Sequence, residues 1–189
     1  GILCLRGNVK LNGYWQCERY FSDIAGIIRE DLTLHGALTG RDRDVLDRIR
    51  SAPSAFIHVR RGDYVTHPVF SEKFAACSLG YYREALTLLR ERVGLGLQFF
   101  VFSNDPGWVR EMKIGGEDAE IIDWNADTPE RDLALMRECS HAVIANSSFS
   151  WWGAWLGDSR ERIVIAPRTW FRHQSSSHDI VPERWLKLG

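Results

Sequence analysis

The chain has 189 residues, 44% of them hydrophobic and 26% charged, which is enough to bury the core of one large globular domain. Its 24 lysine and arginine residues nearly balance 25 acidic ones, and the net charge of −1 argues against a nucleic-acid partner or an anionic membrane surface. No apolar run approaches the ~20 residues of a membrane span, so we expect at most peripheral membrane association. The four cysteines form no CxxC pair, which favours free thiols in a reducing cytoplasm.

Two helical patterns precede the regular part of the chain. Residues 17–30 carry apolar side chains at helical spacing, and residues 39–50 form a second, charge-rich helical pattern. From residue 54 onward, short β-branched and aromatic runs typical of strands alternate with longer amphipathic runs. Strands are expected at residues 55–59, 97–102, 120–122, 141–145 and 163–166, and helices at residues 81–92, 106–112, 129–139 and 149–156. This alternation predicts a doubly wound α/β domain over residues 54–189, with helices on both faces of a parallel sheet.

Small polar or charged residues follow the predicted strands, at the edge where an open α/β sheet binds its ligands. In chain order they are Arg60, Arg61, Gly62 and Asp63; Ser103, Asn104 and Asp105; Asp123 and Asn125; and Asn146, Ser147 and Ser148. Any one of these groups alone is more often a helix N-cap. Their coincidence on one edge, together with a double arginine, indicates a ligand site.

The double arginine suggests that the ligand carries phosphate. Two adjacent guanidinium groups suit a multivalent anion such as a diphosphate. Because successive strand residues point to opposite faces, we expect one arginine to touch the anion and the other to pair with a carboxylate. His58 shares the face of Arg60, and the start of the helix after Ser148 offers free N–H groups as a second phosphate seat. Neither GxGxxG nor GxxxxGK[ST] occurs, which disfavours a Rossmann dehydrogenase and a P-loop NTPase.

Three further motifs have simpler explanations. Asp42-Arg43-Asp44 has the spacing of a DxD metal motif, but it falls in the charge-rich helical segment, where a solvated helix face is expected. Arg61-Gly62-Asp63 spells an integrin-recognition tripeptide, but it leaves a core strand rather than the tip of a long loop. Trp151, Trp152 and Trp155 stand at helical spacing, which favours core packing over a sugar-binding platform.

Four segments, taken together, resemble a known enzyme family. They are Phe56 to Tyr64 (FIHVRRGDY), Phe100 to Glu111 (FVFSNDPGWVRE), Asp132 to Cys139 (DLALMREC) and Asn146 to Leu156 (NSSFSWWGAWL). In this order and spacing they are similar to the bacterial α-1,2-fucosyltransferases, inverting enzymes that use GDP-L-fucose. A lesser match is Gly13-Tyr14-Trp15-Gln16. The Gly-rich GLGNQ-type segment that opens the family has no counterpart here, so we expect this chain to be part of a longer protein.

The resemblance implies a two-domain α/β fold of the GT-B type and chemistry without a metal. Residues 1–53 would be the end of the N-terminal, acceptor-side domain. Residues 54–189 would be the Rossmann-like domain that binds GDP-fucose. The expected partners are GDP-fucose and a galactose-terminated glycan acceptor, and the expected location is cytoplasmic.

The resemblance also implies roles for individual residues at the phosphate end of the site. Arg60 would grip the β-phosphate of GDP-fucose with His58 beside it, and Arg61 would brace the motif or share the phosphate. The diphosphate would rest on the start of the following helix, on Asn146, Ser147, Ser148 and the N–H of Phe149.

Other residues would serve the base and the acceptor. Asp132 resembles the carboxylate that pairs with the N1 and N2 donors of guanine. Asp63 is the candidate general base for the acceptor hydroxyl. The walls of the nucleotide pocket would be Ser103, Asn104 and Asp105.

These features predict transfer of L-fucose from GDP-L-fucose to the 2-hydroxyl of a galactoside, with inversion. Two alternatives remain open. A fucosyltransferase of another linkage would keep the same donor site, because acceptor contacts lie largely in the N-terminal domain. A GDP-sugar-binding fragment would bind the donor but be inactive without that domain.

Overall fold

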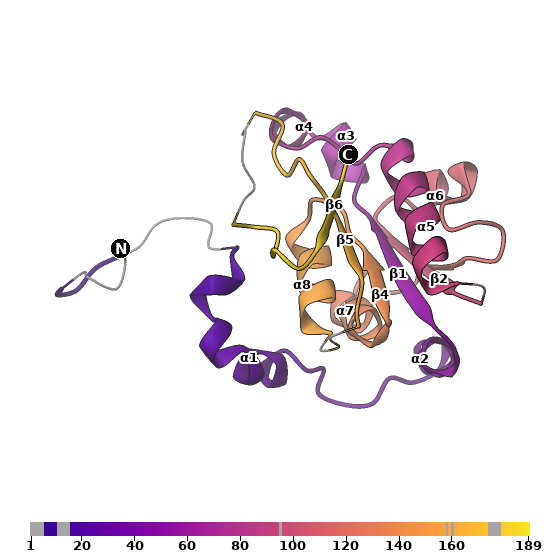
Figure 1. The fold of residues 1–189 in the computed structure, drawn as a ribbon, viewed down its shortest axis with the longest axis horizontal. Helices are drawn as coiled ribbons and strands as arrows, with labels where there is room; N and C mark the ends of the chain where they lie inside the picture. The colour runs from indigo at the N-terminus through magenta and orange to yellow at the C-terminus, as the bar shows by residue number, and fades with distance from the viewer. Residues whose placement is uncertain (1–5, 11–15, 95, 158, 160, 174–178) are drawn as a thin grey trace.

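The computed structural model describes residues 6–10, 16–94, 96–157, 159, 161–173 and 179–189. Residues 1–5 and the tripeptide Gly13-Tyr14-Trp15 lie outside this part. The described strands form one parallel sheet in the order β3-β2-β1-β4-β5-β6 (Figure 1). Their bounds are β1 (Ser54–Val59), β2 (Gln98–Ser103), β3 (Glu120–Ile122), β4 (His141–Val143), β5 (Val164–Pro167) and β6 (Leu186–Leu188). This is the strand order of Rossmann-like folds, so the predicted α/β class with a parallel sheet is confirmed.

Helices cover both faces of the sheet, and each face has its own core. On one face, Phe56, Phe100 and Ile144 pack against α2 (Arg41–Ser51), α7 (Pro129–Glu138) and α8 (Ser148–Leu156). On the other face, Ile57 and Val101 pack against α5 (Leu79–Val93) and α6 (Pro106–Met112). The two cores use alternate residues of the same strands, as the pleat of a sheet buried on both sides requires.

The segment before the sheet folds differently from its predicted helix. The structure divides residues 17–30 into two 3₁₀ turns, η2 (Glu18–Tyr20) and η3 (Ser22–Ile24), followed by α1 (Ala25–Asp31). Phe21 lies between the two turns and stacks on Trp152, with ring centroids 5.5 Å apart. The prediction of one continuous helix is wrong because the chain turns at Phe21 to place this ring on the core.

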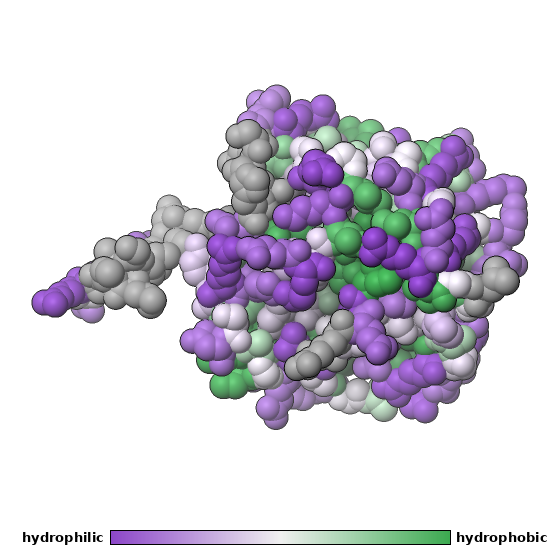
Figure 2. All heavy atoms as spheres, in the orientation of Figure 1, coloured by the Kyte–Doolittle hydropathy of each residue, from purple (hydrophilic) through white to green (hydrophobic). Residues whose placement is uncertain are grey.

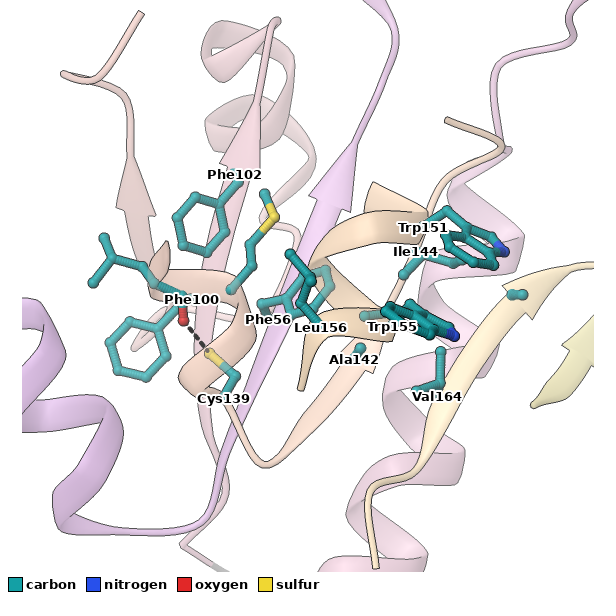
Figure 3. Close-up of a cluster of buried hydrophobic side chains, with 14 of the residues drawn as sticks. Phe56, Phe100, Phe102, Cys139, Ala142, Ile144, Trp151, Trp155, Leu156 and Val164 are labelled. Atoms are coloured by element: carbon teal, nitrogen blue, oxygen red, sulfur yellow. Dashed lines mark hydrogen bonds between the residues drawn. The ribbon is translucent and has the colours of Figure 1, made fainter. Parts of the chain in front are cut away.

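Trp151 and Trp155 of α8 are buried in the core, as their spacing predicted, and Trp152 is partly buried and packs against it. Figure 3 shows Trp151 and Trp155 side by side, and their buried rings lie parallel with centroids 6.0 Å apart. The indole N–H of Trp151 donates to the carbonyl of Ile180, and that of Trp155 donates to Glu18. The cluster therefore attaches both the N-terminal segment and the C-terminal tail to the domain.

Arg162 holds α7 and α8 together at their C-terminal ends. Its guanidinium donates to the carbonyls of Met136 and Arg137 from α7 and to that of Gly153 from α8. The positive charge of Arg162 also interacts favourably with the negative C-terminal ends of both helix dipoles. Because the two C-terminal ends are fixed, the two N-terminal ends keep their places at the opposite edge of the sheet.

On the face seen in Figure 2, hydrophilic residues surround a hydrophobic area that lies over the region between α5 and β6. Leu186 and Leu188 of this edge strand are partly buried and pack against the core on the α5 side.

In the part of the chain that the structure describes, no helix is long and apolar enough to cross a bilayer.

Candidate active site

The order of the strands reverses between β1 and β4, and a cleft of about 530 Å³ opens there. The chain leads from β1 to β2 and β3 on one side, then returns to place β4 on the other side of β1. Ligands of open α/β sheets bind at such a reversal, beyond the carboxyl ends of the strands. The cleft is lined by Gln16, Arg60, Asp63, Tyr64, Phe70, Lys73, Phe74, Asn146, Ser147, Ser148, Phe149, Trp170 and Phe171.

Arg60 enters this cleft directly after β1, and Asp63 orients it. Asp63 lies in the first turn of α3 (Gly62–Thr66) and accepts a hydrogen bond from Arg60 Nη2 at 2.7 Å. Its other oxygen accepts from Asn104 Nδ2 at 2.9 Å. Both oxygens of Asp63 are thus engaged, an arrangement that fixes the guanidinium before any ligand arrives.

Arg61 points away from the cleft. Its guanidinium pairs with Asp105 at 3.1 Å and lies over the ring of Trp108, 5.0 Å from the centroid. Both arginines pair with a carboxylate, and they differ in that Arg60 lines the cleft whereas Arg61 does not.

The residues that follow β2 brace the turn of the double arginine. Asn104 Oδ1 accepts from the backbone N–H groups of Arg61 and Gly62, at 2.9 and 3.2 Å. A Cβ at Gly62 would lie 3.0 Å from the Asn104 amide, so this close approach favours glycine. Ser103 Oγ donates to the carbonyl of Val59, and Asp105 caps α6 through the N–H of Trp108. These three residues support the cleft from behind and do not line it.

The start of α8 forms the opposite wall. Ser147 is its N-cap residue and makes no capping bond with its side chain, and Ser148 is the first helical residue. The first N–H groups of a helix have no partner within it, and the dipole makes this end positive. Asn146 is buried and donates to the carbonyls of Ala75 and Trp170, which joins the walls of the cleft. Lys73, at the end of α4 (Pro68–Lys73), adds a second cation to Arg60.

His58 lies below the cleft, buried in β1, and its ring contacts that of Phe149 with centroids 5.6 Å apart. Nδ1 has no hydrogen-bond partner in the described part of the chain. Burial, and then the charge of Arg60, lower the pKa of His58 to about 3. The imidazole is therefore neutral at physiological pH and packs below the cleft as an uncharged ring.

We expect His58→Gln to flatten the dependence of stability on pH. Between pH 6.5 and about 3 the unfolded wild-type chain binds a proton at His58 that the folded chain does not. The free energy of unfolding therefore falls as the pH falls, by up to about 1.4 kcal/mol per pH unit from this residue. Urea denaturation at several pH values from 4.5 to 7.5 measures the two slopes. Equal slopes for both proteins would show that His58 titrates normally in the folded state.

Asp132 lies in the first turn of α7, which is the neighbour of α8 on the same face of the sheet. The structure places Asp132 at the same edge of the sheet as the cleft, although Asp132 does not line it. Its Oδ1 accepts from Asn125 Nδ2 at 2.9 Å. Burial raises the pKa of Asp132 to about 6; the hydrogen bond from Asn125 opposes the rise, and the charges of Asp42 and Glu130 add to it.

The prediction that Asp42-Arg43-Asp44 lies on a solvated helix face is wrong for Asp42. Arg43 and Asp44 are exposed, but Asp42 is only 2% exposed and accepts hydrogen bonds from Trp124, Asn125 and Arg131. Helix α2 packs against α7, so this face of the helix is internal and the carboxylate is saturated by N–H donors.

Sequence reasoning missed the aromatic wall of the cleft. Phe74 stacks on Tyr64 with ring centroids 4.8 Å apart and contacts Phe171 at 5.4 Å. The dipeptide His67-Pro68 signals the break before α4. No local pattern connects α4 with Phe171, which lies about a hundred positions further along the chain, so only the tertiary fold assembles this wall.

A Rossmann-like sheet with two cations and a helix N-terminus at its strand reversal is an arrangement that suits the phosphate groups of a nucleotide. The chain belongs to glycosyl transferase family 11, whose family model matches residues 5–188. This agrees with the resemblance found in the sequence.

Several proteins are similar to this chain. An alpha-1,2-colitosyltransferase of Escherichia coli is 38% identical over 97% of this chain and 64% of its own length. The O-antigen biosynthesis glycosyltransferase WbnK of Escherichia coli is 31% identical over 73% of this chain and 45% of its own length. Galactoside alpha-(1,2)-fucosyltransferase 1 of Saimiri boliviensis boliviensis is 31% identical over 78% of this chain and 43% of its own length. The chain thus spans 43% to 64% of the length of these three relatives.

Proposed function

We propose that this chain is the donor-binding part of an inverting glycosyltransferase that moves L-fucose from GDP-L-fucose to the 2-hydroxyl of a galactoside. The observation that carries the proposal is the cleft at the strand reversal, which is lined by Arg60, by Lys73 and by the start of α8. The names of the fucosyltransferase relatives support the transferred sugar, the acceptor and the linkage. A GT-B arrangement is part of the proposal, with residues 1–53 leading from an acceptor-side domain into the sheet, onto which α2 packs through Val45, Leu46 and Ile49.

The cleft suits the charge that develops in this reaction. When GDP leaves C1 of fucose, negative charge grows on the β-phosphate and oxocarbenium character grows on the sugar. A guanidinium held in advance by Asp63, together with the N–H groups of α8, would stabilise the leaving phosphate. One such preorganised donor contributes about 3 kcal/mol to a transition state. Fixed cations at this place support metal-independent chemistry.

Asp63 has a clear structural partner. Because its two oxygens accept from Arg60 and Asn104, we propose that it chiefly positions Arg60. The role of general base stays a prediction from the sequence.

The free thiols of Cys17, Cys77 and Cys139 support the cytoplasmic location that we propose for the enzyme.

A second candidate is the transfer of colitose, a sugar that lacks the 3-hydroxyl of fucose. It is favoured by the alpha-1,2-colitosyltransferase, with 38% identity over 97% of this chain. The two candidates have the same linkage and differ in the transferred sugar. We propose GDP as the nucleotide for both, so comparing turnover of GDP-fucose and GDP-colitose distinguishes them.

Calorimetric titration with GDP, GDP-fucose, ADP and UDP in the presence of EDTA tests the proposal. We expect the guanine nucleotides to bind at least tenfold more tightly than the other two, without added metal. Equal affinity for all four would contradict the donor assignment. Binding that appears only after Mg²⁺ or Mn²⁺ is added would contradict metal-independent chemistry.

A further inference from the structure

Asp42 begins a chain of hydrogen bonds that ends at Asp132. Oδ1 of Asp42 accepts from Trp124 Nε1 at 2.9 Å and from Asn125 Nδ2 at 2.8 Å, and Oδ2 pairs with Arg131 at 3.1 Å. Asn125 Nδ2 also donates to Asp132 Oδ1 at 2.9 Å. Both hydrogens of the Asn125 amide are therefore used to connect two carboxylates, one on α2 and one on α7.

We propose that Asp42 and Asn125 are positioning residues that fix the Asp132 carboxylate for recognition of guanine. The inference rests on the proposed function and on the guanine-binding role that the resemblance implies for Asp132. It assigns to the first residue of the DxD-like motif a task in base recognition, carried out through Asn125 and without a metal.

The burial of this network supports a positioning role. Asp42 is 2% exposed and Asn125 is 4% exposed, and a buried carboxylate is tolerated only when hydrogen bonds replace its lost hydration. An apolar residue could fill the same volume without that cost, so packing alone does not account for the acid. What an apolar residue could not do is orient the Asn125 amide.

The geometry leaves both oxygens of Asp132 able to accept from a ligand. Oδ1 accepts from Asn125 and keeps a further lone pair, while Oδ2 accepts no hydrogen bond from the described part of the chain. Guanine offers two neighbouring donors, N1–H and N2–H, which need a carboxylate held in one plane. The charged groups around Asp132 are Asp42 on α2 and Glu130 and Arg131 on α7. The hydrogen bond from the fixed Asn125 amide thus limits rotation of the Asp132 carboxylate, which these neighbouring charges surround.

The test compares the affinities of GDP, ADP and pyrophosphate for the wild type and three variants of Asp42 and Asn125. We expect Asp42→Ala and Asn125→Ala to weaken GDP binding about tenfold, the effect of one lost hydrogen bond to a charged group. Pyrophosphate affinity should stay within about twofold, because this probe uses only the phosphate seat. Asp42→Asn should restore GDP binding, because its amide oxygen still accepts from Asn125.

Asp44→Ala is the matched control, since it removes an exposed acid from the same helix, and we expect it to bind all three ligands like the wild type. A wild-type preference for GDP that survives in Asp42→Ala and Asn125→Ala would overturn this inference alone. Equal losses of GDP and pyrophosphate would also overturn it, because they would show a general structural role. A wild type with no preference for GDP over ADP would overturn the guanine-binding role of Asp132, and this inference with it. If Asp42→Ala does not fold, Asn125→Ala decides by the same criteria.

Discussion

Replacing Arg60 by alanine should weaken the binding of GDP-fucose about a hundredfold and leave the fold intact. The side chain is only partly buried and lies at the edge of the sheet, so its loss opens no cavity in either core. It would remove a charge-assisted contact to the phosphate, and loss of such a contact costs 2 to 5 kcal/mol or more. It would also leave Asp63 without its cation, so that the carboxylate repels the diphosphate.

Calorimetric titration with GDP-fucose measures this effect, and circular dichroism follows the fold. Arg83→Ala serves as the control, because it removes the same charge from an exposed position on α5. If Arg60→Ala binds GDP-fucose as tightly as Arg83→Ala does, Arg60 does not hold the phosphate.

Asp132→Asn should reduce the preference for GDP over ADP by about tenfold to a hundredfold. A carboxylate accepts from both donors of guanine, whereas an amide presents one acceptor and one donor, and the donor would face an N–H of the base. Hydrogen bonds to charged groups are worth about 1.5 to 3 kcal/mol, which corresponds to this range. Competition titrations with GDP and ADP measure the ratio, and an unchanged ratio would refute the guanine-binding role.

The same variant should be more stable than the wild type at neutral pH. The pKa of Asp132 is raised from 3.8 to about 6 in the folded state, so ionisation of this buried group destabilises the fold as the pH rises through this range. Above pH 6 the cost is about 2 to 3 kcal/mol, and asparagine avoids it. Thermal unfolding at pH 7.5 and pH 4 should show a gain in stability at the higher pH that disappears at the lower one. A variant no more stable at pH 7.5 would contradict the raised pKa.

The regular elements of the sheet could be predicted because their signals are local. The run 97–102 is β-branched and aromatic and ends at Ser103, and β2 covers Gln98–Ser103. The helix predicted at residues 106–112 coincides with α6, whose start is set by Asp105 as N-cap and Pro106 at the first turn. Strand β6 (Leu186–Leu188) was not predicted, and it joins the sheet by pairing with β5.

For the site, the sequence by itself determined which residues leave each strand, and therefore that Arg60, Asp63, Asn146 and Ser147 meet at one edge. Parallel strands place their carboxyl ends together, so this followed from the alternation of elements alone. Only the tertiary structure decided the partners, because they come from distant parts of the chain. In the folded chain Arg61 donates a hydrogen bond to Asp105, and the buried Asp42 accepts one from Asn125. The sequence of α2 has charged residues at most of its positions, which predicts a solvent-exposed helix. In the fold, α7 packs against one face of α2 and buries Asp42.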